Sequence, residues 1–124
     1  CLRRQGHGRI LFNGSGLGYA ALPLRGAYNA SKFAIEGLVD TLRLELAGSG
    51  IDVVLLEPGP IVSRFRANSL AALRRHVDTA CGPHVAAYRR MSERLAKEGA
   101  AVPFTLPAEA VAQALLHALE HPRP

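Results

Sequence analysis

The sequence of 124 residues has little cysteine and no long apolar run, and each shortage removes a class of protein. The two cysteines, Cys1 and Cys81, stand far apart without a Cys-x-x-Cys or Cys/His spacing, which excludes a disulfide framework and a zinc site. The five histidines show no ligand spacing either, so no metal is expected. Apolar runs such as 53–56 are far shorter than the roughly 18–20 residues that cross a bilayer. We therefore expect a protein without a membrane span, in a reducing, cytoplasmic setting.

Lysine is also scarce, because 13 of the 15 basic residues are arginine. The formal charge of +5 does not indicate nucleic-acid binding, since the arginine pairs are spread along the chain without interleaved aromatic residues. Hydrophobic residues make up 48% of the chain and charged residues 20%, which is enough apolar material for a core. The composition therefore predicts a globular domain and excludes a disordered segment.

Methionine occurs once, at Met91, and the sequence opens on Cys1. We therefore expect the chain to be a fragment or a processed product of a longer polypeptide. The first ten residues carry three arginines but no apolar stretch, so they do not form a secretory signal.

Hydrophobic periodicity predicts a strand, a helix and a second strand in the first half of the chain. Residues 9–12 follow a glycine-rich turn and end in three apolar residues, which is typical of a short buried strand. Apolar residues then recur at three- and four-residue steps over 27–47, which predicts an amphipathic helix. Glycines at 48 and 50 end the helix, and the β-branched run 51–56 predicts the second strand. This order is a βαβ unit, which makes the two strands parallel and the crossover right-handed.

The second half of the chain reads differently. A Pro-Gly-Pro break at 58–60 ends the second strand, and we expect an irregular or helical insertion after it, with a polar helix over about 84–97. A last helix is predicted after the prolines at 103 and 107. Two strands do not make a stable parallel sheet, so the chain corresponds to about half a domain. We divide it into 1–60 with the two strands, 61–106 as the insertion and 107–124 as the last helix.

Two side chains on the predicted helix carry recognisable chemistry. Tyr28 and Lys32 are four residues apart, so they project from the same face of the helix. A protonated lysine beside a tyrosine favours the phenolate, which allows the tyrosine to act as a general acid or base. Ser15 follows the first strand, at the carboxyl edge where open α/β sheets bind ligands. Alone, each signal is weak, because a Tyr-x-x-x-Lys pair is also common on ordinary helix surfaces.

The order of these motifs resembles the short-chain dehydrogenase/reductase family over essentially the whole chain. Residues 8–15 are similar to the strand that carries its Asn-x-Ser motif, 26–33 to its active-site helix, and 51–63 to its Pro-Gly strand and loop. The resemblance implies an α/β fold with a Rossmann-like, doubly wound parallel sheet, of which this chain carries the carboxyl-terminal portion. It implies an enzyme that interconverts an alcohol and a ketone or aldehyde by hydride transfer, with NAD or NADP as cofactor.

The resemblance also implies roles for particular residues. Tyr28 is the expected acid/base, Lys32 supports it and bonds the nicotinamide ribose, and Ser15 holds the substrate oxygen. Residues 61–106 look like the substrate-binding segment of bacterial members similar to retinol- and hydroxysteroid-type dehydrogenases. The helix over 27–47 is expected to make the intact protein a homo-oligomer. The expected cofactor-binding residues are Asn13, Tyr28, Lys32, Pro58, Gly59, Ile61 and Ser63.

The chain departs from the family pattern by lacking its amino-terminal half. The missing half holds the glycine-rich turn that binds the pyrophosphate and the residue that selects between the two ribose forms of the cofactor. Two hypotheses therefore stay open. The first is the catalytic half of an NAD(P)-dependent oxidoreductase, and the alternative is a catalytically incompetent truncated fragment, or an interaction and dimerisation fragment, of such an enzyme.

Overall fold

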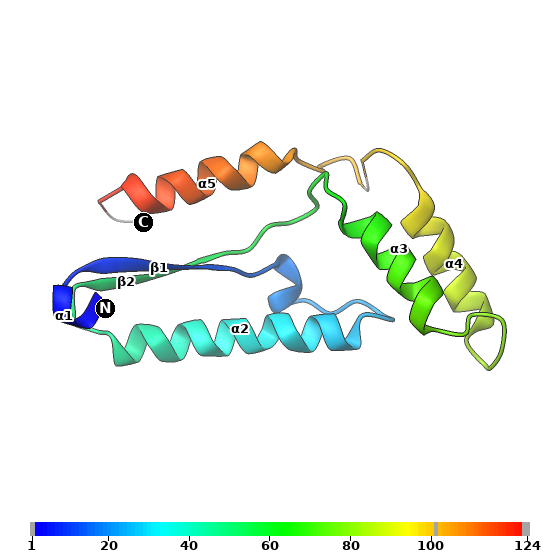
Figure 1. The fold of residues 1–124 in the computed structure, drawn as a ribbon, viewed down its shortest axis with the longest axis horizontal. Helices are drawn as coiled ribbons and strands as arrows, with labels where there is room; N and C mark the ends of the chain where they lie inside the picture. Colours follow the sequence, from blue (N-terminus) through cyan, green and yellow to red (C-terminus); the bar gives the residue numbers. More distant parts are fainter. Residues whose placement is uncertain (1, 101, 123–124) are drawn as a thin grey trace. The chain divides into compact units, whose positions relative to one another are not determined.

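The computed structural model describes residues 2–100 and 102–122 and is an α/β structure (Figure 1). Within these residues no helix is both long and apolar enough to cross a bilayer. The chain divides into two compact units, residues 2–59 with 109–122 and residues 60–108. In chain order the elements are α1 (Leu2–Gln5), β1 (Gly8–Asn13), the 3₁₀ turn η1 (Gly16–Gly18), α2 (Gly26–Glu45), β2 (Ile51–Leu56), α3 (Phe65–His76), α4 (Val85–Ala96) and α5 (Ala108–Glu120).

The centre of the first unit is a parallel pair of strands. β1 and β2 pair in one register from Gly8 opposite Ile51 to Asn13 opposite Leu56. α2 connects them, so the predicted βαβ unit and the α/β class are confirmed. Most residues of both strands are only half-buried, because two strands offer few neighbours to cover them.

α2 covers one face of the sheet and begins and ends close to the predicted bounds. Val39, in its second half, is fully buried, and Leu46 just after its end is buried as well. The prediction placed the end of the helix at 47, but the structure ends it at Glu45. The last turn closes instead through a hydrogen bond of 3.0 Å from the Ser49 N–H to the Leu46 carbonyl, and Gly48 takes a φ of 75°. A positive φ suits glycine, which explains why the helix stops here.

α5 lies on the opposite face of the same sheet (Figure 1). Arg9 of β1 links the sheet to this helix. The Nη1 atom of Arg9 donates to the carbonyls of Ala118 and Leu119, at 2.8 and 2.6 Å, in the last turn of α5. Its Nε atom lies 3.3 Å from the Asp52 carboxylate on β2. A cation suits the carboxyl end of a helix, where carbonyls have no helical partner and the helix dipole is negative. Arg9 therefore joins both strands and α5.

The second unit is a helical hairpin closed at its base. α3 and α4 pack on each other, and Leu95 is buried. The base is a parallel bridge between Ile61 and Leu106, with a hydrogen bond of 2.9 Å from the Val62 N–H to the Leu106 carbonyl. The polar helix predicted over 84–97 is confirmed as α4. The sequence left the form of the preceding segment open, and it is the helix α3.

Glu36 lies where α2 packs on the turn η1. A Cβ atom at Gly18 would overlap the Glu36 carboxylate, so a larger residue there would require the Glu36 side chain to move. The Oε1 atom of Glu36 is buried without a hydrogen-bond partner among the described residues. Burial, followed by the charge of the Glu57 carboxylate, raises the pKa of Glu36 above its ordinary value of 4.5. Asp40 adds to this effect and Arg43 opposes it.

The raised pKa of Glu36 predicts a pH-dependent stability. The protonated carboxyl is favoured in the folded state, so its contribution is fully present below pH 4.5 and is lost as the pH rises through the raised folded pKa. The substitution Glu36→Gln keeps the shape without the charge. It should therefore unfold at higher urea than the parent near pH 7, and the difference should vanish at acidic pH. Glu45→Gln on the exposed side of α2 is the control, and an equal gain for both variants would contradict the assignment.

The Arg9 junction predicts a loss of stability on substitution. Arg9→Met keeps the aliphatic stem but leaves two helix-end carbonyls and Asp52 without their donor. We expect the free energy of unfolding to fall by about 2 kcal/mol, the size of a charged hydrogen bond. Urea titration followed by circular dichroism measures it. Arg3→Met, at an exposed position of α1, is the control. A loss of unfolding free energy for Arg9→Met no larger than that for Arg3→Met would show that Arg9 contributes little.

Candidate functional site

The carboxyl ends of β1 and β2 lie close to the start of α2 (Figure 1). The predicted site residues of the first unit belong to these strand ends, to the segments that leave them and to the first turns of α2. Two backbone hydrogen bonds hold the segments that leave the strands together. The Gly14 N–H donates to the Leu56 carbonyl at 2.8 Å, and the Gly16 N–H donates to the Pro58 carbonyl at 3.2 Å. The segment that carries Ser15 is therefore fixed against the Pro-Gly segment, as an edge of a parallel sheet allows.

Lys32 links α2 to the end of β1. Its Nζ atom donates to the Asn13 carbonyl at 3.1 Å and lies 5.7 Å from the centroid of the Tyr28 ring. Both side chains are half-buried, and they occupy adjacent turns of the helix as their spacing predicts. An ammonium group has three hydrogens, so the bond to Asn13 leaves two for a ligand. The structure thus brings Asn13, Tyr28 and Lys32 together.

Ser15 caps the short turn η1. Its backbone is extended, with φ −173° and ψ 151°, and its Oγ atom accepts a hydrogen bond of 3.2 Å from the Leu17 N–H. The Ser15 carbonyl accepts a second bond of 2.7 Å from the Gly18 N–H. Accepting a bond uses a lone pair and leaves the hydroxyl hydrogen able to donate. The turn therefore fixes Ser15 without consuming the donor that a substrate oxygen would need.

The other predicted residues divide between the units. Pro58 and Gly59 follow β2 in the first unit, and an added Cβ at Gly59 would meet no atom within 4 Å, so a flat ligand can approach this backbone closely. Ile61 and Ser63 belong to the second unit, where Ile61 forms the bridge at its base. Ser63 accepts a hydrogen bond of 3.3 Å from the N–H of Phe65 and so opens α3.

Asn29 is a buried polar residue that the sequence analysis did not single out. Its side chain is 7% exposed and lies one residue after Tyr28. It bonds the carbonyls of Leu17 and Ala20, in the segment between Ser15 and α2. The same segment holds Leu24 at a φ of 60°, a conformation that residues other than glycine rarely adopt. In the sequence, only the position of Asn29 next to Tyr28 could have indicated a functional role. Helical periodicity does not predict that a loop folds back onto the helix.

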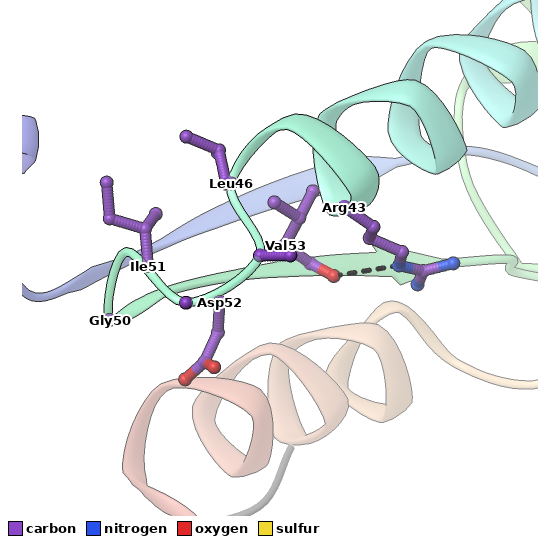
Figure 2. Close-up of a pocket in the computed structure, with 8 residues that line it drawn as sticks. Arg43, Leu46, Gly50, Ile51, Asp52 and Val53 are labelled. Carbon is purple, nitrogen blue, oxygen red and sulfur yellow. Dashed lines mark hydrogen bonds between the residues drawn. The ribbon is translucent and has the colours of Figure 1, made fainter.

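A cavity of about 310 Å³ lies at the other end of the sheet, between the end of α2 and the start of β2 (Figure 2). Arg43 donates from Nε to the Val53 carbonyl at 3.1 Å across this cavity. The cavity lies at the amino end of β2, whereas the site predicted from the sequence lies at the carboxyl ends of the strands, so the two do not coincide. Its lining consists of Arg43, Leu46, Ala47, Gly48, Gly50, Ile51, Asp52 and Val53.

Comparison with known proteins gives the site a family context. Residues 1–74 match the family described as short chain dehydrogenase. The chain is 54% identical over 63 residues to the uncharacterized oxidoreductase YbbO of Escherichia coli (strain K12), a match that covers 51% of this chain and 23% of that protein. It is 33% identical over 129 residues to human 17-beta-hydroxysteroid dehydrogenase type 1, covering 99% of this chain and 37% of the relative. Human retinol dehydrogenase 8 is 41% identical over 69 residues, covering 56% of this chain and 22% of the relative.

The chain thus spans well under half the length of these relatives. The matched residues include β1, α2 and β2, with every predicted site residue. The predicted resemblance is confirmed: this chain belongs to the short chain dehydrogenase family.

Proposed function

We propose that this chain is the carboxyl-terminal, catalytic part of an NAD(P)-dependent oxidoreductase that interconverts an alcohol and a ketone or aldehyde by hydride transfer. The observation that carries the proposal is the placement of Lys32 between Tyr28 and the Asn13 carbonyl at the carboxyl edge of the sheet. A tyrosine that gives up its proton is left with a negative charge, and a nearby ammonium group stabilises that charge. Family membership supports the oxidoreductase class.

The half-exposed strands support the view that the working protein contains more than this chain. β1 and β2 form a two-stranded sheet with half-buried faces, whereas a stable parallel sheet needs more strands and cover on both sides. The greater length of the relatives is consistent with such an addition. We infer that an amino-terminal half supplies the missing strands and the site for the cofactor pyrophosphate.

The residues of this chain fit the nicotinamide side of the cofactor. Lys32 keeps two ammonium hydrogens for ribose hydroxyls, and the open backbone at Gly59 suits a flat ring. Asn13 and Pro58 lie at the same edge of the first unit. For Ile61 and Ser63, which belong to the second unit, the cofactor role rests on the family resemblance alone. When bound, the nicotinamide supplies or takes the hydride.

In the reducing direction, Tyr28 donates its phenolic proton to the oxygen of the substrate carbonyl. The Lys32 ammonium group stabilises the phenolate that remains, because an opposite charge nearby favours the ionised form. Ser15 donates a hydrogen bond to the same substrate oxygen as negative charge develops on it. In the oxidising direction the Tyr28 phenolate takes the proton of the substrate hydroxyl.

The names of two relatives point to bulky apolar alcohols and ketones as the substrate class, a hydroxysteroid in one case and retinol in the other. The second unit supports this choice through its exposed apolar side chains. Contact with an apolar ligand would remove these side chains from water, which favours binding. They are Val62, Phe65, Phe104 and Leu106, which are 46–70% exposed.

The proposed mechanism predicts that Tyr28→Phe in the complete protein lowers kcat by about 10²- to 10⁴-fold, the usual contribution of a general acid or base. The hydroxyl is lost while the ring stays, so the dissociation constant of the cofactor should change by no more than a few fold. Steady-state kinetics with a ketone or alcohol substrate and fluorescence titration of the reduced cofactor measure the two effects. A fully active Tyr28→Phe variant would remove the acid/base assignment.

The interaction-fragment hypothesis remains the second candidate, and one surface favours it. Phe33 and Leu44 of α2 are 46% and 80% exposed, and they fall on the same side of the helix because they are eleven residues apart. A face of this kind suits self-association, which the family resemblance also implies for this helix. On this hypothesis the chain acts by pairing with another subunit and does not catalyse a reaction.

The purified 124-residue chain provides a test. It should bind NAD or NADP only weakly by calorimetry, because we assign the pyrophosphate site to the amino-terminal half, and it should sediment as a dimer or larger species. The double variant Phe33→Glu/Leu44→Glu should shift the sedimentation to a monomer. A micromolar cofactor dissociation constant for the chain alone would show that the amino-terminal half is not needed for binding, and a monomeric parent chain would contradict association through α2.

A further inference from the structure

Asn29 makes three hydrogen bonds to one short segment of backbone. Its Nδ2 atom donates to the Ala20 carbonyl at 2.7 Å and to the Leu17 carbonyl at 3.2 Å. Its Oδ1 atom accepts from the Leu22 N–H at 3.5 Å, the weakest of the three. Both hydrogens and the oxygen of the amide are therefore used. A buried amide without partners costs about 1–3 kcal/mol, so this side chain specifies where the segment lies.

The segment that Asn29 holds is the one that carries Ser15. The Leu17 carbonyl accepts the hydrogen bond from Asn29, and the Leu17 N–H donates to the Ser15 hydroxyl at 3.2 Å. Asn29 is also the residue next to Tyr28 on α2. A short path of two hydrogen bonds and one peptide link therefore connects the hydroxyl of Ser15 to the backbone of Tyr28, bypassing the loop between them.

We propose that Asn29 is a positioning residue that fixes Ser15 relative to Tyr28, an inference that rests on the proposed function. The direct chain between the two residues includes a stretch over 19–25 without helix or strand, and such a loop does not by itself fix a distance. The three bonds of Asn29 fix the part of this stretch that ends at Leu22.

The substitution Asn29→Asp isolates the donor role. Aspartate has the size of asparagine and retains an oxygen for the Leu22 N–H. Its second oxygen faces the carbonyls of Leu17 and Ala20, so two attractive contacts become repulsive. Asn29→Ala is the second variant, because it removes the contacts without adding a charge, and the freed groups of Ala20 and Leu22 lie in exposed residues where water can reach them.

Kinetics of the complete protein test the proposal. Both Asn29 variants should lower kcat by about 10- to 100-fold through misplacement of Ser15. For Asn29→Ala, the cofactor dissociation constant and the midpoint of the pH profile of kcat should stay at the parent values, because Tyr28 and Lys32 are unchanged and no charge is added beside them. Gln113→Glu, the same amide-to-acid change at an exposed position of α5, should leave kcat unchanged.

A double-mutant cycle with Ser15→Ala distinguishes positioning from a general structural effect. If Asn29 acts through Ser15, the variant Ser15→Ala/Asn29→Ala should be about as active as Ser15→Ala alone, since the hydroxyl to be positioned is already gone. Additive losses would overturn the inference and leave the proposed function standing. If the parent protein shows no turnover, or Tyr28→Phe stays active, the proposed function itself fails and the role of Asn29 fails with it.

Discussion

The attachment of α2 to the two strands by Lys32 and Arg43 is the constraint on which the first unit depends. In a parallel pair, each strand turns every second carbonyl away from its partner, so both outer edges carry acceptors that the pair itself does not satisfy. Lys32 donates to one such carbonyl, that of Asn13 on β1, and Arg43 donates to another, that of Val53 on β2. Between them Val39 is fully buried against the sheet. The helix thus binds both edges through polar contacts and the face through an apolar one.

This attachment explains why Lys32 has both a structural role and a proposed chemical role. Lys32 has to reach the carboxyl end of β1 to bond Asn13, and that end is where the segments leaving both strands meet. Its ammonium group consequently comes to rest near the Tyr28 ring. Arginine would satisfy the Asn13 carbonyl equally well, but its broad planar group lacks the compact, movable charge of lysine. The scarcity of lysine elsewhere in the chain agrees with this distinction.

Periodic segments were the predictable part of the fold. The strand over 51–56 has the predicted bounds, and the long helix differs by one residue at its start and two at its end, because both carry an unbroken apolar pattern. The pairing of Tyr28 with Lys32 followed from spacing alone. The turn η1 is not predictable from hydrophobic periodicity, because three residues are too few to show a repeat. The sequence does not distinguish a helix from an irregular segment at α3, because the apolar residues there do not gather on one face. Asn29, Glu36 and Arg9 depend on which distant backbone atoms converge on them, and no local pattern records that convergence.

The bond between Arg9 and the end of α5 joins residues that are 109 and 110 positions apart in the chain. Ribosomes add roughly 5–20 residues per second, so β1 emerges several seconds or more before its partner helix exists. The β1–α2–β2 portion is made of nearer neighbours in sequence and closes smaller loops, which makes it the natural first step of folding. During that interval one face of the strands stays uncovered, and the closing helix protects the sheet only once synthesis has passed residue 119. The last layer of the first unit is therefore also its latest to form, and an interruption of synthesis before that point would release a chain with an exposed sheet.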